Sequence, residues 1–137
     1  MTTTEQNLRT ARAWLLDAFN NHRVEAVPDY ISEHYINVGT TALTGHEAGR
    51  AVIAQADMWA PDRHIDIRYL TATDDVVMVL FTLSGTHSGT FQDIPATGRR
   101  FSVWMSDVFR FDDAGKMIEG WVIGKGDLRA ALADQSH

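Results

Sequence analysis

Two ionisable residues, Asp107 and His87, stand in segments whose other residues are typical of buried strands. In the segment 76–87 the odd positions are mostly apolar, and His87 shares their parity. In the segment 101–110 Asp107 shares the parity of the apolar residues in the same way. Because side chains alternate between the two faces of a strand, we expect both groups to project into an apolar interior, provided that no bulge shifts the register.

A polar pocket would explain why a carboxylate and an imidazole face an apolar interior, since burial of an unpaired charge is costly. In a pocket poor in water the pKa of Asp107 would rise, which makes the carboxylate a better proton acceptor. His87 could donate a hydrogen bond to a developing enolate oxygen, or hold Asp107 in place if their strands are adjacent. The alternatives are a structural Asp107 paired with an arginine, an exposed Asp107 after a register shift, and a satisfied core histidine at 87.

The first half of the chain shows helical periodicity. Apolar residues recur at helical spacing from Leu8 to Phe19, which predicts an amphipathic helix that ends near Asn20 and Asn21. The segment Val24 to Ile31 predicts a short second helix with Pro28 in its first turn, and Tyr35 to Val38 a short extended piece. A third helix is expected from His46 to Trp59, which ends before Pro61.

Beyond Arg63 the periodicity changes to that of strands. Ile65, Ile67 and Tyr69 alternate with Asp66 and Arg68, and a turn at 73–75 leads into a strand over 76–88, which together predict a hairpin. A second hairpin is expected from strands at 99–111 and 117–123, joined by a turn at 112–115. Asp127 could cap a short terminal helix that carries Leu128, Ala131 and Leu132.

Helices followed by an antiparallel sheet predict an α+β fold in one domain over residues 1–137. A strongly curved sheet wrapped on the helices would leave a cone with an open mouth. The chain has no cysteine, no segment typical of a signal peptide and no window of membrane-spanning length, so we expect a cytoplasmic protein that does not associate with membranes. The formal net charge of -6 argues against nucleic acid as a partner.

Common cofactor and metal motifs are absent from the sequence. The six histidines show no HExxH or comparable spacing, and no cysteine is present to bind zinc. Gly85 and Gly89 do not form a phosphate-binding loop, and there is no GxGxxG pattern. We therefore expect neither a metal nor an organic cofactor.

Four segments together resemble the SnoaL-like polyketide cyclases, within the superfamily of nuclear transport factor 2-like domains. They are GTHSG at 85–89, IPATGRRF at 94–101, DVFRF at 107–111 and GKMIEGW at 115–121. The resemblance covers nearly the whole chain. It implies a cone-shaped fold in which a curved, mostly antiparallel sheet is wrapped on the N-terminal helices around a deep apolar pocket. It also implies an intramolecular aldol reaction of a polyketide ester that requires neither metal nor organic cofactor.

The chain departs from the family pattern at the residues that carry this chemistry. By position, Val122 replaces the acid/base carboxylate of the last strand, and Asp107 replaces the histidine of the strand before it. Gly120 replaces a position that is often histidine, which would enlarge the cavity or remove a contact. The family histidine of the GTHSG segment is retained as His87, so Asp107 could be a relocated carboxylate.

The resemblance also implies which residues line the pocket. An aromatic residue and an amide at the positions of Tyr35 and Asn37 line it in the family and could hydrogen-bond a substrate carbonyl, although a tyrosine there could equally pack with its hydroxyl at the surface. The apolar wall is expected from Trp14, Met58, Trp59, Phe81, Met105 and Val122, each of which could instead be core.

Trp104 and Trp121 have the opposite parity to Asp107 and Val122. They therefore belong to the outer sheet face, where they predict a homodimer or a higher homo-oligomer.

The expected function is that of a cofactor-independent cyclase or isomerase, which acts on an apolar, polyketide-like carbonyl compound by general acid/base catalysis. Asp107 would remove an acidic proton, and His87 would stabilise the enolate. Two alternatives remain open: a SnoaL-like hydroxylase or epoxide hydrolase, and a non-catalytic module for small-molecule binding or assembly.

Overall fold

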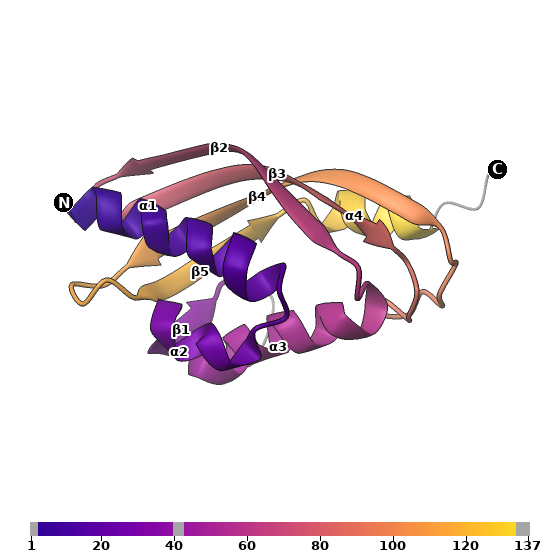
Figure 1. Ribbon diagram of the computed structural model, residues 1–137, viewed down its shortest axis with the longest axis horizontal. Helices are drawn as coiled ribbons and strands as arrows, with labels where there is room; N and C mark the ends of the chain where they lie inside the picture. The colour runs from indigo at the N-terminus through magenta and orange to yellow at the C-terminus, as the bar shows by residue number, and fades with distance from the viewer. Residues whose placement is uncertain (1–2, 40–42, 134–137) are drawn as a thin grey trace.

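The structure, a computed structural model, describes residues 3–39 and 43–133. Helical segments come first, and most of the sheet follows (Figure 1). In chain order the elements are α1 (Thr3–Ala13), η1 (Trp14–Phe19), η2 (Val24–Ala26), α2 (Val27–Tyr30), β1 (Ile31–Asn37), α3 (Gly45–Trp59), β2 (His64–Thr73), β3 (Val76–Thr86), β4 (Arg100–Phe111), β5 (Met117–Ile123) and α4 (Lys125–Ala133).

The helices predicted from the sequence are present. The first prediction corresponds to α1 and η1, which follow each other directly, η1 being a π-helical segment. The second corresponds to the short pair η2 and α2, with Pro28 in the first turn of α2, and the third to α3. Each packs an apolar stripe toward the sheet, because Leu15, Val27 and Ile53 are all fully buried.

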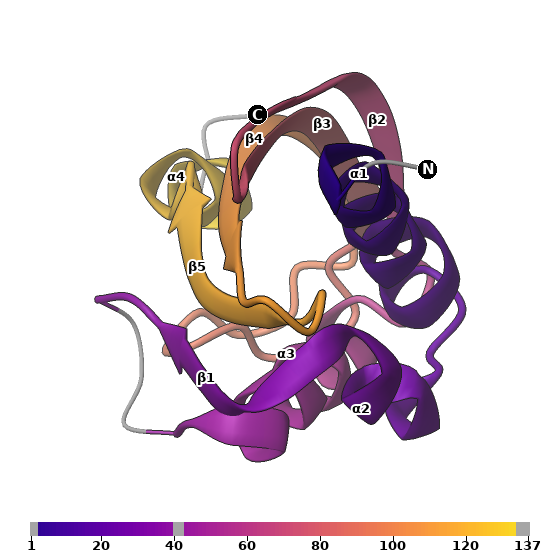
Figure 2. The same cartoon turned by 90° about the vertical axis from the view of Figure 1, so that its left-hand side faces the viewer.

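The sheet has the strand order β1-β5-β4-β3-β2, in which β1 runs parallel to β5 and the other neighbours are antiparallel. Figure 2 shows the sheet curling into an arc, with α1 and the α2 and α3 helices closing its open side. This confirms the α+β class and the curved, mostly antiparallel sheet that the sequence predicts.

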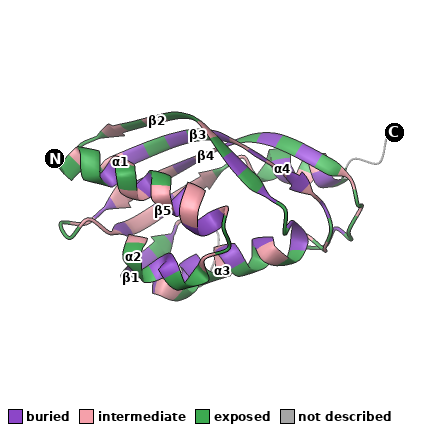
Figure 3. Ribbon diagram, in the orientation of Figure 1, coloured by how far each residue is buried: buried purple, intermediate pink, exposed green. Residues whose placement is uncertain are grey.

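The two central strands pair without a bulge. The register of β3 and β4 is continuous from Val76 opposite Arg110 to Thr86 opposite Arg100. Consequently the odd positions of both strands stay on the concave face, and the buried and exposed residues alternate along them (Figure 3). Asp107 and His87 both lie on the buried face, as their parity predicts.

The outer hairpin contains a bulge that changes one prediction. Ile67 pairs with Phe81, whereas Tyr69 pairs with Leu80, so Arg68 is an extra residue in β2. The bulge reverses the parity of the strand, and Tyr69 is 73% exposed. The prediction that Tyr69 shares the face of Ile65 and Ile67 is therefore wrong.

The last helix begins earlier than the sequence predicts. α4 starts at Lys125, directly after Gly124, whose φ of +108° is readily adopted by glycine. Asp127 therefore lies in the first turn and is not the cap. The apolar residues Leu128 and Leu132 are buried, as expected for this helix.

Two polar side chains fasten the N-terminal helical segment to the edge of the sheet. Asn20 accepts a hydrogen bond from the Ile65 backbone N–H at 2.8 Å and donates one to the Ile65 carbonyl at 3.0 Å. The buried guanidinium of Arg63 donates to the Phe19 carbonyl at 2.8 Å and pairs with Asp57 of α3 at 2.6 Å. These contacts join η1, α3 and the start of β2 at one end of the cone.

Candidate functional site

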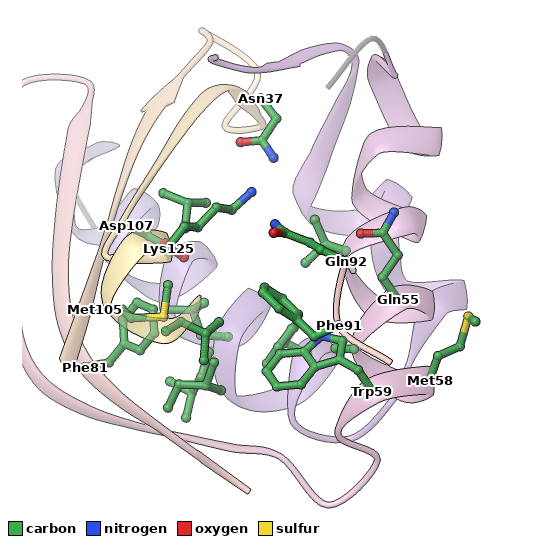
Figure 4. Close-up of a pocket in the computed structure, with 18 of the residues that line it drawn as sticks. Asn37, Gln55, Met58, Trp59, Phe81, Phe91, Gln92, Met105, Asp107 and Lys125 are labelled. Atoms are coloured by element: carbon green, nitrogen blue, oxygen red, sulfur yellow. The ribbon is translucent and has the colours of Figure 1, made fainter. Parts of the chain in front are cut away.

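A cavity of about 410 Å³ lies between the concave face of the sheet and the helices (Figure 4). Most of its wall is apolar. The lining residues are Trp14, Leu15, Phe19, Asn37, Val52, Gln55, Ala56, Met58, Trp59, Ile65, Phe81, Leu83, Thr90, Phe91, Gln92, Met105, Asp107, Val122, Lys125 and Leu128. A cavity of this size and character is typical of a small-molecule site.

Asp107 is the buried carboxylate of this wall. It lies on β4 between Val79 of β3 and Val122 of β5, and its side chain points to the concave face. The residue is 8% exposed, and its Oδ1 atom has no hydrogen-bond partner among the described residues. Burial raises the pKa of Asp107 to about 7, and the positive charge of Lys125 acts in the opposite direction. A carboxyl with this pKa can both accept and return a proton near neutral pH.

The apolar residues predicted from the sequence lie where they were expected. Trp14, Met58, Trp59, Phe81, Met105 and Val122 all line the cavity. Met58 is 75% exposed and therefore belongs to the rim. Asn37, at the end of β1, also lines the cavity, and it is buried (Figure 4).

Several polar lining residues were not identified from the sequence. They are Gln55 of α3, Thr90 and Gln92 of the loop between β3 and β4, and Lys125 of α4. Loop residues have no periodicity that would assign them to a face. Gly124 could have indicated the position of Lys125, because a glycine between a strand and a helix marks the point at which the chain turns.

Tyr35 is buried but does not line the cavity. A Cβ atom added to Gly120 would lie 1.9 Å from its hydroxyl oxygen, so the tyrosine fills the space above this glycine. The prediction that a glycine at 120 enlarges the cavity is therefore wrong. Burial, followed by the charge of Asp107, raises the pKa of Tyr35, and the hydroxyl stays protonated near neutral pH.

His87 is fully buried and is absent from the cavity wall. Its Nδ1 lies 3.0 Å from the Thr97 hydroxyl, and its ring meets that of Trp59 edge to face. Asp107 faces Val79, eight residues before His87 on the same strand segment, so the two side chains are far apart. The idea that His87 holds Asp107 in place is therefore wrong. Burial lowers the pKa of His87, which favours the neutral imidazole.

The GTHSG segment nevertheless has a structural role at the end of α3. The backbone N–H groups of Ser88 and Gly89 both donate to the carbonyl of Trp59, at 3.0 and 3.1 Å. A Cβ atom on Gly89 would lie 2.0 Å from the carbonyl oxygen of Met58. The segment thus fixes the end of α3 and, with it, the Trp59 wall of the cavity.

Neither a metal cluster nor a membrane-spanning helix is found in the described part of the chain. Within residues 3–39 and 43–133, no group of three or more histidine, aspartate or glutamate side chains could hold a metal ion. None of the helices in these ranges is long and apolar enough to cross a bilayer.

The family comparison covers most of the chain: the model of the family described as SnoaL-like polyketide cyclase matches residues 9–132. Two curated proteins are each 27% identical over 93 residues, which is 64% of this chain. They are the aklanonic acid methyl ester cyclases DauD of Streptomyces sp. (strain C5) and DnrD of Streptomyces peucetius. The match spans 58% of DauD and 64% of DnrD, less than two thirds of either relative.

A solved structure shares the same fold. The crystal structure of a putative SnoaL-like polyketide cyclase from Jannaschia sp. CCS1 superposes with a TM-score of 0.84. The superposition covers 97% of this chain and 95% of that chain, at 21% identity. At this identity the likeness shows the fold, which agrees with the cone-shaped architecture described above.

Proposed function

We propose that this chain, which belongs to the SnoaL-like polyketide cyclase family, is a cyclase for a polyketide-like carbonyl compound, with Asp107 as its acid/base residue. The observation that carries the proposal is the carboxylate of Asp107 in the wall of a largely apolar cavity, with a pKa of about 7. The similarity to the two aklanonic acid methyl ester cyclases supports the reaction class.

The chemistry is an intramolecular aldol addition. Ionised Asp107 removes a proton from a carbon between two carbonyl groups, and the C–H electron pair becomes an enolate. The enolate carbon then attacks a ketone carbonyl of the same chain, forming a C–C bond while the carbonyl electron pair moves to oxygen. That alkoxide takes up the proton from Asp107, which restores the carboxylate.

The pairing of β4 with β5 supports the idea that the acid/base carboxylate lies on β4 in this chain, one strand away from the expected position on β5. Asp107 and Val122 are direct partners across β4 and β5, and both line the cavity. The Cβ atoms of directly opposed residues are roughly 5 Å apart. Asp107 therefore lies at the same level of the cavity as the position where the family resemblance leads us to expect the acid/base residue.

The cavity would supply the remaining contribution by positioning. Trp14, Trp59 and Phe81 offer flat or bulky apolar surfaces against which a carbonyl-rich chain can fold. Holding two reacting groups together can contribute roughly 7 to 11 kcal/mol to lowering a barrier, so a base of modest strength is sufficient.

A second candidate function is ligand binding without catalysis. The observation that favours it is Val122, an apolar residue in the cavity wall at the place where the family resemblance leads us to expect the acid/base residue. In that case Asp107, whether neutral or ionised, would accept a hydrogen bond from the ligand, and no covalent bond would change.

Proton exchange in deuterated water tests the proposal. The wild-type protein and the variant Asp107→Asn are incubated with aromatic and linear β-dicarbonyl esters, and deuterium uptake and product mass are followed by mass spectrometry. Asp113→Asn, an exposed site in the turn between β4 and β5, is the matched control. We expect exchange above the buffer rate in the wild type and in the control, and its loss in Asp107→Asn.

Other outcomes would point elsewhere. Binding without exchange would contradict the aldol proposal and favour the binding function. Exchange that survives in Asp107→Asn would contradict the assignment of the base. Incorporation of labelled oxygen from water or dioxygen into the product would favour a hydroxylase or an epoxide hydrolase.

A further inference from the structure

We propose that the mouth of the cavity holds a subsite for an anionic oxygen of the substrate, formed by the Lys125 ammonium and the Gln92 carboxamide. The inference rests on the proposed function in so far as the ligand is taken to be a carbonyl compound. Both residues line the cavity and come from separate elements, α4 and the loop between β3 and β4.

Lys125 is an ammonium group directed into the cavity without an ion-pair partner in the described residues. Its Nζ has no carboxylate within 4.0 Å in those ranges. Its charge acts on Asp107 at longer range, where it offsets part of the rise in pKa that burial causes. It also lies in the first turn of α4, where the helix dipole disfavours a positive charge. Helix stability therefore does not explain a lysine at this position.

The backbone fixes where this lysine points. Gly124 packs against β4, since a Cβ atom added to it would lie 3.1 Å from Cγ of Met105. The helix thus begins directly on the strand that carries Asp107. Figure 4 shows the Lys125 side chain extending from this point across the cavity.

Gln92 is held in an unusual backbone conformation with φ +53°. The tight turn around it is closed by two backbone hydrogen bonds between Phe91 and Ile94, at 3.0 and 2.8 Å. Only a few per cent of non-glycine residues have a positive φ, and the conformation is costly unless the surroundings support it. Here it places the side chain in the cavity wall, where Figure 4 shows the carboxamide pointing toward Lys125.

Arg129 determines which end of the Gln92 carboxamide is offered to a ligand. Its Nη1 lies 2.9 Å from Oε1 of Gln92 and 2.7 Å from Oδ1 of Asp93. A guanidinium has no acceptor, so the atom that faces it must be the amide oxygen. The NH₂ group is therefore left to donate to a ligand.

Helix α4 supports both groups of the subsite, because it carries Lys125 itself and also Arg129, which contacts Gln92. Lys125 and Arg129 are four residues apart and lie on the same face of the helix. Lys125 presents its charge directly, whereas Arg129 orients Gln92 and is a positioning residue. The result is a pair of hydrogen-bond donors at the mouth, in the same cavity as the carboxylate of Asp107.

This arrangement fits a substrate whose reactive carbonyl part is joined to, or itself forms, an anionic oxygen. A carboxylate and the delocalised enolate of an acidic dicarbonyl share that chemistry. The overall charge of the chain is -6, so general attraction of anions is not expected, and a preference for an anion requires a local cation. Lys125 would also reduce the repulsion between such an anion and Asp107.

Paired probes test the subsite by binding alone. The first pair is 2-naphthoate with its neutral methyl ester, and the second is ionised 4-hydroxycoumarin with its neutral methyl ether. Affinities are measured by isothermal titration calorimetry on the full chain. We expect the wild type to prefer the anion in at least one pair by about tenfold, which corresponds to about 1.4 kcal/mol. The pair that shows the preference distinguishes the carboxylate from the enolate.

Variants assign the preference to named atoms. Lys125→Met should abolish the preference while the neutral probe still binds. Lys116→Met is the matched control, because it removes the same charge from a lysine whose Nζ donates to the Asp29 carbonyl instead. Gln92→Leu and Arg129→Met should each weaken the preference partly, and retained binding of the neutral probe would show that the cavity is intact.

Equal binding of anion and neutral probe by the wild type, including no binding of either, would overturn the subsite. So would an equal effect of Lys125→Met and Lys116→Met. The outcome is separate from that of the exchange experiment, since Asp107→Asn should keep the anion preference while it loses exchange. A preference without catalysis would leave the subsite standing and contradict the cyclase proposal.

Discussion

The ionisation of Asp107 links the chemistry of the cavity to the stability of the fold. Burial raises the pKa from its ordinary value of 3.8 to about 7. The unfolded chain loses this proton near the ordinary pKa, whereas the folded protein keeps it up to about pH 7. The contribution of Asp107 to stability is therefore fully present below about pH 4 and is lost as the pH rises to about 7. Above that pH the carboxyl is ionised in both states, and no further loss follows.

Asp107→Asn should remove this dependence, because an amide does not ionise. The free energy of unfolding of the variant minus that of the wild type should rise across the window by up to about 4 kcal/mol. Urea titrations at a series of pH values measure it. Asp113→Asn, at an exposed site in the turn between β4 and β5, is the control for the removal of one carboxyl group. A difference that is constant with pH would show that the carboxyl is not perturbed.

Gly120 and Tyr35 form a second pair that can be tested at the level of single atoms. In Gly120→Ala the new Cβ would lie 1.9 Å from the tyrosine hydroxyl, so one of the two must move. Overpacking of this kind costs about 1 to 3 kcal/mol. Thermal unfolding of Gly120→Ala, of Tyr35→Phe and of the double variant should show the substitution to be less harmful when the hydroxyl is absent. Additive effects would contradict the close contact.

The elements of the fold depend on a few directional contacts between helix and strand. Asn20 uses both ends of its carboxamide on the backbone of Ile65, at the edge of the sheet. It thereby satisfies backbone groups of β2 and fixes how η1 meets that strand. Asn21 next to it is exposed and lies in the turn after η1, where its amide is 3.5 Å from the Asp17 side chain.

Asn20→Ala should therefore destabilise the protein by about 1 to 3 kcal/mol, because it leaves the Ile65 backbone groups without these partners. Asn21→Ala is the matched control and should change stability by less than about 0.5 kcal/mol. Chemical denaturation of both variants compares them directly. Equal effects would mean that the two hydrogen bonds at Ile65 do not hold the edge.

The sequence predicted best those elements in which apolar and polar residues alternate regularly, because this pattern shows which side chains are buried. The parity of β3 and β4 placed Asp107, Phe81 and Met105 on the buried face correctly, since eleven consecutive pairs keep one register. The same reasoning assigned Tyr69 to the wrong face, because Arg68 is an extra residue in β2 and no residue type in this segment indicates a bulge. It also missed Gln92 and Lys125, whose positions depend on a loop turn and on where a strand gives way to a helix.

His87 shows the limit of parity at a site. Its period placed it correctly in the interior, but period says nothing about position along the strand. The distance from Asp107 depends on register between strands, which becomes known with the structure. Parity along a strand thus indicates whether a polar residue is buried, whereas its position along the strand decides whether it lines the cavity.

At the scale of the whole molecule, the convex face of the sheet carries several exposed apolar side chains. Trp104 is 55% exposed and Met78 is 51% exposed, and Leu80 and Trp121 share the same outward parity. The guanidinium of Arg68 lies over the Trp104 ring, 5.5 Å from its centre. Since the concave face surrounds the cavity, a second copy could bind the convex face without blocking the mouth.

We therefore predict that the chain forms a homodimer through this face. Trp104→Glu would place a charge in the centre of the interface and should convert a dimer to the monomer of 15.3 kDa. Val24→Glu, at an exposed residue of η2 outside the sheet, introduces the same charge and should leave the dimer intact. Sedimentation equilibrium over a range of concentrations measures the three masses. A wild type that stays monomeric, or a dimer that survives Trp104→Glu, would show that the convex face has another role.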